Sequence, residues 1–178
     1  KAVAASDFNG DGKADLVSAN YDGNNITVFI NNGNGTFGVG ATYPSIGAKP
    51  NGVTAADFNG DGKADLVSTN KTGNNITVFM NNGNGTFGVG TTYPTNSSQP
   101  TSVTNADFNG DGKTDLVTAN ALGHKLTVFL NNGNGTFGVG TTYPTIGNTP
   151  ISVTSADFNG DGKADIASAN MTGNNITV

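Results

Sequence analysis

The segment Asp-Phe-Asn-Gly-Asp-Gly-Lys-Ala-Asp occurs four times in this chain, at an interval of fifty residues. It begins at Asp7, Asp57, Asp107 and Asp157, and only Thr114 departs from it. Twelve of the thirteen acidic residues lie in these four nonapeptides, and the chain has no Glu. Three carboxylates within nine residues repel one another, so each segment needs a positive charge to offset the repulsion.

The oxygen-bearing groups of the nonapeptide stand at alternate positions. In the first copy they are Asp7, Asn9, Asp11, the carbonyl of Lys13 and Asp15. At this spacing a tight loop surrounds a hard cation with oxygen ligands, and Gly12 stands sixth, where such a loop turns sharply. The loops lack the sulfur and imidazole ligands that softer metals prefer, because the chain has no Cys and its single His lies elsewhere. We therefore predict one Ca²⁺ in each repeat, four in the chain.

The other three repeats carry the same predicted ligand set. Its members are Asp57, Asn59, Asp61, Lys63 and Asp65; Asp107, Asn109, Asp111, Lys113 and Asp115; and Asp157, Asn159, Asp161, Lys163 and Asp165. An EF-hand would add Glu at position twelve, where Ser or Thr stands here. The following residues are β-rich and lack helical periodicity, so the loop is predicted to join two strands of a hairpin. The alternative is a polar turn without metal, which Asn-Gly and Asp-Gly pairs also form.

A repeat of about fifty residues is typical of propeller blades or stacked arrays. Each copy contains four short β-rich stretches separated by turn signals, and in the second copy we expect strands at 52–58, 65–69, 75–80 and 86–93. This predicts an all-β fold, a β-propeller built of four-stranded antiparallel blades. The expected units are three complete blades, 1–50, 51–100 and 101–150, and an incomplete fourth blade, 151–178. Together they would form one propeller domain or part of one.

Longer stretches of the repeat are similar to a known family. The chain resembles the FG-GAP or VCBS repeats of integrin-like β-propellers in DFNGDGKADLVSAN, NNITVFINNGNGTFG and the closing TYP, over essentially its whole length. The resemblance implies that each acidic nonapeptide binds calcium between the first two strands of a blade. It also implies that ligands are met on the face opposite the calcium loops. One departure is Gly38-Val39-Gly40, where Gly-Ala-Pro is typical of the family.

The composition indicates an extracellular β protein. Hydrophobic residues make up 34 % of the chain and charged residues 12 %, and 27 Gly make it rich in turns. With no Arg and eight scattered Lys, nucleic-acid binding through a basic stripe is not expected. Calcium would replace disulfides as the cross-link outside the cell. No apolar run reaches membrane-spanning length, and the start at Lys1 in mid-pattern predicts a processed or excerpted piece whose targeting segment is missing.

The differences between the repeats gather in two places. One is the turn after the second strand, residues 21–25 and their counterparts, and the other is the connection to the next repeat, residues 45–49 and their counterparts. Because strands alternate in direction, these two regions should share one face of the disc, and the first and third turns should share the other. The variable face is either a recognition surface for a protein or glycan ligand, or the product of drift on exposed turns.

The chain shows no arrangement typical of an enzyme. Twelve of its thirteen acidic residues lie in the predicted calcium loops. His124 has no second His and no acidic residue near it in the sequence, as expected of a surface turn residue. Three functions stay open: an adhesion or protein-recognition module of a secreted or surface protein, a carbohydrate-binding lectin, and a structural building block of an extracellular assembly or filament. The absence of Trp counts against the lectin, because sugar rings stack best on large aromatic faces.

Aromatic residues recur at equal positions of the repeats and predict the packing between blades. Tyr43, Tyr93 and Tyr143 are expected to pack there rather than to form platforms for sugars, and Phe8, Phe29 and Phe37 with their copies should supply the core. The fourth repeat stops at Val178, soon after its third strand begins, which leaves an open seam. We therefore expect a homo-oligomer, or the continuation of a longer chain, to close the propeller.

Overall fold

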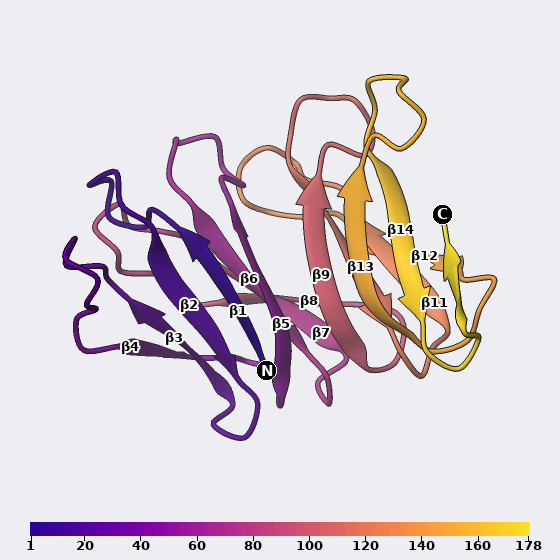
Figure 1. Ribbon diagram of the computed structural model, residues 1–178, viewed down its shortest axis with the longest axis horizontal. Coiled ribbons are helices and arrows are strands. Elements are labelled where there is room, and N and C mark those ends of the chain that lie inside the picture. Colours follow the sequence, from indigo (N-terminus) through magenta and orange to yellow (C-terminus); the bar gives the residue numbers. More distant parts are fainter.

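The computed structural model describes residues 1–178 and contains fifteen strands and no helix (Figure 1). The strands form four antiparallel sheets, each in chain order, which we call the first to fourth blades. The first blade is β1 (Ala2–Ser6), β2 (Asp15–Asn20), β3 (Asn25–Phe29) and β4 (Ala41–Pro44); the second is β5 (Pro50–Ala56), β6 (Asp65–Asn70), β7 (Asn75–Phe79) and β8 (Thr91–Pro94). The third is β9 (Pro100–Ala106), β10 (Asp115–Asn120), β11 (Lys125–Phe129) and β12 (Thr141–Pro144); the fourth is β13 (Pro150–Ala156), β14 (Asp165–Asn170) and β15 (Asn175–Thr177).

The blades stand side by side in an open arc. Their first strands, β1, β5, β9 and β13, contact one another in succession, while β4, β8 and β12 lie at the far edge of each sheet (Figure 1). This confirms the predicted all-β fold, in the form of an unclosed part of a propeller. No helix of the structure is long and apolar enough to cross a membrane.

The second strand of each inner blade supplies the core on both of its faces. In β6 every residue is buried, and the alternation of side chains places Leu66 against the first blade and Val67 against the third. A strand covered on both faces needs apolar residues on both faces, which explains the uninterrupted Leu-Val pair.

Aromatic rings close the first two junctions between blades, as predicted. Phe87 of the second blade meets Phe8 and Tyr43 of the first edge to face, with ring centroids 5.6 Å apart in both pairs. Phe137 of the third blade meets Phe58 and Tyr93 of the second in the same way, at 5.5 and 5.7 Å. This geometry aligns the positive edge of one ring with the negative face of the other.

The fourth strand is shorter than predicted, because residues 81–88 form a compact loop instead. The N–H of Asn82 donates to the carbonyl of Thr86 at 2.9 Å, and Phe87 forms only an isolated bridge to Asn81. Gly83 and Gly85 take left-handed conformations, with φ of 86° and 78°, that a regular strand does not contain. The predicted strand 86–93 was therefore wrong at its start, and β8 begins at Thr91.

The first strand of the second repeat also differs from its expected bounds. It was predicted at 52–58 and extends over Pro50–Ala56. Phe58 belongs to the following loop, because its N–H donates to the side-chain carboxylate of Asp65 at 3.1 Å rather than to a backbone carbonyl of the neighbouring strand.

Candidate metal centre

The four acidic loops all join the first strand of a blade to the second, so they lie at the same end of the blades. In each blade the loop lies between the two residues of the last pair of the antiparallel ladder that joins the first and second strands. In the second blade this pair is Ala56 and Asp65. The corresponding pairs are Ser6 with Asp15, Ala106 with Asp115, and Ala156 with Asp165. The predicted ligands therefore occupy one hairpin loop per blade, with the last acid at the start of the second strand.

The first acid of each loop organises the backbone around itself. Asp57 accepts hydrogen bonds from the N–H groups of Gly60 at 2.7 Å, Asp61 at 3.2 Å and Gly62 at 2.7 Å. Gly60 and Gly62 both have a φ of 80°, where a side chain would strain the backbone. The other three loops repeat this pattern around Asp7, Asp107 and Asp157.

These backbone donors stabilise the ionised form of the first acid. In the third and fourth loops the N–H groups of Gly112 and Gly162 hold the pKa of Asp107 and Asp157 below its usual value. A lowered pKa means that the contribution of these acids to stability is present above the ordinary Asp pKa. It is lost as the pH falls through the lowered value.

The middle acid forms an ion pair within its own loop. Asp11 accepts the N–H of Lys13 at 3.0 Å, and its second oxygen lies 3.1 Å from the Lys13 ammonium. The hydrogen bond from the Lys13 side chain lowers the pKa of Asp11. Asp61 and Asp111 pair with their own Lys at 3.6 and 3.2 Å. The pairs are exposed, and pairs of this kind contribute little to stability.

The last acid of the loop is buried in the first three blades, and it accepts hydrogen bonds from two different loops of its blade. Both oxygens of Asp65 are used: one accepts the N–H of Phe58 at 3.1 Å, and the other accepts the N–H of Asn81 at 2.8 Å. Asp15 and Asp115 make the same two bonds in their blades. Burial raises the pKa of Asp65 and Asp115, so ionising these acids costs stability: the part of the stability that is linked to their titration is greatest at low pH and is lost as the pH rises through the raised value.

The donor set of each loop suits a hard cation in its chemistry, since every predicted ligand is an oxygen. A carboxylate has about four acceptor positions, and the bonds described above leave some of them free. However, no three acidic or His side chains lie close enough together to hold a metal ion between them. Calcium binding by the twenty predicted ligands stays a prediction. It would require Asp11, Asp61 and Asp111 to turn from their Lys side chains toward the other oxygens.

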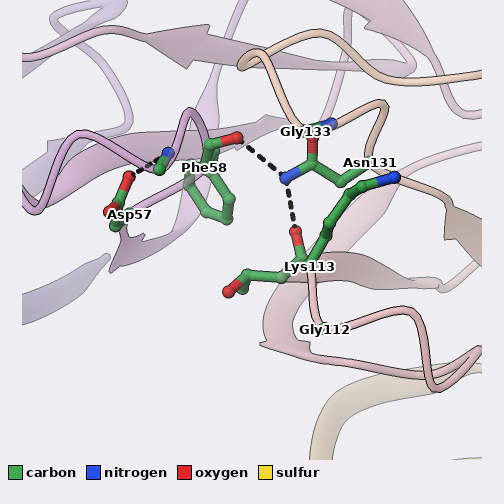
Figure 2. Close-up of a pocket in the computed structure, with 8 residues that line it drawn as sticks. Asp57, Phe58, Gly112, Lys113, Asn131 and Gly133 are labelled. Carbon is green, nitrogen blue, oxygen red and sulfur yellow. Dashed lines mark hydrogen bonds between the residues drawn. The ribbon is translucent and has the colours of Figure 1, made fainter.

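Neighbouring acidic loops enclose polar hollows where blades meet. Figure 2 shows the hollow of about 260 Å³ between the second and third blades, with Asp57 and Phe58 on one side and Lys113 and Asn131 on the other. The side-chain amide of Asn131 donates to the carbonyls of Phe58 and Thr114, both at 2.9 Å, and so joins the two blades. Sequence reasoning missed this Asn, although the unvaried Asn-Asn-Gly-Asn-Gly of each complete repeat was the available signal.

The variable turns and connections lie together at the opposite end of the blades. The N–H of Lys71, in the second turn of the second blade, donates to the carbonyl of Lys49 in the preceding connection at 3.0 Å. Equivalent bonds join Ala121 to Gln99 and Met171 to Thr149. Each variable connection therefore contacts a variable turn of the next blade. This confirms that the two variable regions share one end of the blades, as the alternation of strand directions predicted.

A protein family and several solved structures are similar to this chain. The family described as FG-GAP-like repeat matches residues 7–68, 57–118 and 107–168, and no curated protein matches the chain. An Agrocybe aegerita lectin that recognises non-reducing terminal N-acetylglucosamine is 26 % identical, with a TM-score of 0.61 over 98 % of this chain and 50 % of that chain. A Photorhabdus luminescens Tc holotoxin pore is 27 % identical, with a TM-score of 0.54 over 93 % of this chain and 8 % of that one.

A third structure shares the fold at lower identity. The V. cholerae biofilm matrix protein Bap1 is 22 % identical, with a TM-score of 0.50 over 96 % of this chain and 29 % of that chain. The chain thus spans half or less of the length of these three solved structures.

Proposed function

The chain belongs to the FG-GAP-like repeat family, and from this we propose that it is a non-catalytic recognition or adhesion module of an extracellular protein, with calcium as a structural ion. One observation carries the proposal: four loops with the same hydrogen bonds lie at one end of the blades, and all the variable segments lie at the other. A rigid scaffold that displays variable loops on one face is typical of recognition proteins.

The exposed apolar residues of the variable segments support recognition. Ile46 and Ile146 lie in connections, Leu122 and Met171 lie in second turns, and all four side chains are exposed. Exposed apolar residues on variable loops are candidates for contact with another molecule. Drift on turns that need only stay soluble would favour polar residues at these positions.

The role proposed for calcium follows from the charge of the loops. Each loop holds three carboxylates, with oxygens of an Asn and of the Lys carbonyl between them. A bound Ca²⁺ would neutralise the carboxylates and fix the hairpin between the first two strands. Extracellular calcium is concentrated enough to occupy weak sites of this kind, which supports an extracellular setting.

A lectin is the second candidate function. It is supported by the similarity to the N-acetylglucosamine-binding lectin over 98 % of this chain, and by the polar hollow between the loops. Asp57 and Lys113 at that hollow carry polar groups for sugar hydroxyls, whereas both amide N–H groups of Asn131 are already bonded to carbonyls (Figure 2). Its one apolar lining residue, Phe58, is buried and offers no open ring face for stacking. A glycan array in millimolar calcium distinguishes the lectin from a protein-binding module.

We expect that replacing the variable segments by one uniform sequence abolishes recognition without unfolding the protein. The change covers residues 21–25 and 45–49 and their counterparts, because the differences between the repeats gather there. Changes on exposed turns usually alter stability by less than about 0.5 kcal/mol each. Binding is measured on a glycan array and on immobilised extracellular-matrix proteins, and thermal unfolding is measured beside it.

A matched control changes the same kind of surface elsewhere. Val39, Val89 and Val139 are exposed outside the variable segments, and their replacement by Ser should leave binding unchanged. Undiminished binding by the uniform chain would assign the sequence differences to drift.

We further propose that the outer faces of the first and fourth blades are covered by a second copy or by further residues of a longer chain. Phe37 is 39 % exposed and Phe158 is 51 % exposed, whereas their counterparts Phe87 and Phe58 are 6 % and 1 % exposed. Burial of such rings against a partner is favourable. Light scattering at micromolar concentration in calcium should give a mass above the 17.9 kDa of one chain. A monomer at every concentration tested argues against self-association.

A further inference from the structure

One residue in the second turn of each complete blade holds both ends of the variable connection that follows. In the second blade this residue is Asn74. Its backbone carbonyl accepts the N–H of Thr95 at 3.0 Å, and its side-chain oxygen accepts the N–H of Gln99 at 2.8 Å. The first blade repeats both bonds around Asn24, at 3.1 and 2.9 Å. An amide side chain carries no charge that changes with pH.

The third blade has His124 at this position. Its carbonyl accepts the N–H of Thr145 at 3.2 Å, as in the other two blades. Its side-chain acceptor, however, is a ring nitrogen, because the N–H of Thr149 donates to Nδ1 at 2.9 Å. A ring nitrogen accepts a hydrogen bond only while it carries no proton. The bond therefore requires a neutral ring, with its single proton on Nε2.

The residue that this bond holds has a strained backbone. Thr149 has a φ of 60°, in the left-handed region, where a β-branched side chain is rarely found. Its counterparts Lys49 and Gln99 have φ of 63° and 58°, but their side chains are unbranched. A strained conformation persists only while the surrounding structure holds it. The end of the third connection thus depends on its hydrogen bonds more than the ends of the other two.

Few titratable groups surround His124. Lys125 follows it at the start of β11, and Tyr143 lies on the neighbouring strand β12. Connections 95–99 and 145–149 both bond to the turn of His124, and turn 171–175 bonds to the second of them. These three segments contain no acidic or basic residue. They therefore offer no carboxylate that could bond to a protonated ring.

We propose that His124 is a pH-sensitive latch on the variable face: protonation of its ring breaks the bond from Thr149 and releases the end of connection 145–149. A protonated Nδ1 is a donor that faces a second donor, so repulsion replaces the bond. Histidine ordinarily changes its charge between about pH 5 and 8. Because only the neutral ring forms the bond, its stabilising effect is present above this range and is lost as the pH falls through it.

Release of Thr149 alters the variable face on both sides of this residue. Its carbonyl accepts the N–H of Met171, in the second turn of the fourth blade, at 2.9 Å. Its own connection carries Ile146, whose side chain is 85 % exposed. The position of Ile146 relative to Met171 should therefore change with pH, unlike the segments that Asn24 and Asn74 hold. The consequence for ligand binding rests on the recognition function proposed above, whereas the release of Thr149 does not.

The test is hydrogen exchange of single amides, measured by NMR on the 178-residue protein in millimolar calcium, at about pH 7.5 and about pH 5. Protection factors correct each rate for the intrinsic effect of pH on exchange. The factor of the Thr149 amide should fall at least about tenfold at the lower pH, because its hydrogen bond is lost. The factor of the Gln99 amide should not change, because Asn74 does not titrate. An unchanged factor for Thr149, or an equal fall for Gln99, would overturn the proposal.

The other repeats supply the matched variants. His124→Asn gives the third blade the acceptor of the first two, so the protection of Thr149 should become independent of pH. Asn74→His should make the protection of Gln99 fall in acid. Circular dichroism at both pH values verifies that each variant is folded, and if Asn74→His does not fold, His124→Asn decides alone. A fall at Thr149 that persists in His124→Asn would overturn the proposal. Neither variant is read out through a ligand, so this result is separate from the outcome of the recognition experiments.

Discussion

Removal of calcium with EGTA is expected to lower the melting temperature of this protein by about 10–20 °C. Extracellular calcium sites have dissociation constants of about 10⁻⁴ to 10⁻³ M. At a free calcium concentration of about ten times that constant, each site contributes about 1.4 kcal/mol, and four independent sites several times as much. This is comparable to the whole stability of a modest domain. Thermal unfolding in EGTA and in millimolar calcium measures the effect, and calorimetry counts the bound ions.

A single-site variant tests whether the loops act independently. Asp61→Ala removes one predicted ligand, so the stoichiometry should fall from about four to about three, and the cost in calcium should be one site's share. In EGTA the same change should cost little, because the Asp61 carboxylate is exposed and bonds only to Lys63 of its own loop. An unchanged melting temperature in EGTA, or a stoichiometry near zero, would mean that the nonapeptides are only turns.

Asp65→Ala is expected to destabilise the protein by about 3–5 kcal/mol even without calcium. Asp65 is buried, and its two oxygens accept the N–H groups of Phe58 and Asn81. The Ala side chain leaves both donors without an acceptor, and a hydrogen bond to a charged group contributes about 1.5–3 kcal/mol. Urea unfolding of both proteins in EGTA measures the difference.

Two controls separate this structural role from a role in metal binding. Asp65→Asn keeps one oxygen as an acceptor and should recover roughly half of the loss. Asp61→Ala, in the same loop but exposed, should cost less than about 0.5 kcal/mol in EGTA. Equal losses for Asp61→Ala and Asp65→Ala in EGTA would contradict the buried role of Asp65.

The elements that depend on neighbours close in the chain were predictable from the sequence. The alternation of apolar and polar residues and the Asn-Gly and Asp-Gly turns indicate four antiparallel strands in each repeat, and the fifty-residue period indicates blades. The grouping of uniform and variable turns at opposite ends follows from strand direction alone. The structure bears out the fold and this grouping. The start of the fourth strand was wrong, because hydrogen bonds within residues 81–88 outweighed the strand propensity of Thr86 and Phe87.

The sequence could not show which of two equal residues is buried. Phe37 and Phe87 lie in the same ten-residue segment of successive repeats, yet Phe37 is 39 % exposed and Phe87 is 6 % exposed. Phe87 packs against Phe8 and Tyr43 of the preceding blade, whereas Phe37 lies in the first blade and packs against no preceding blade. In the same way, the bond from Asn81 to Phe8 joins residues 73 positions apart. The repeat by itself determined the blade and its loops, whereas the tertiary structure decided which junctions are closed, because burial depends on a neighbour that the local sequence does not specify.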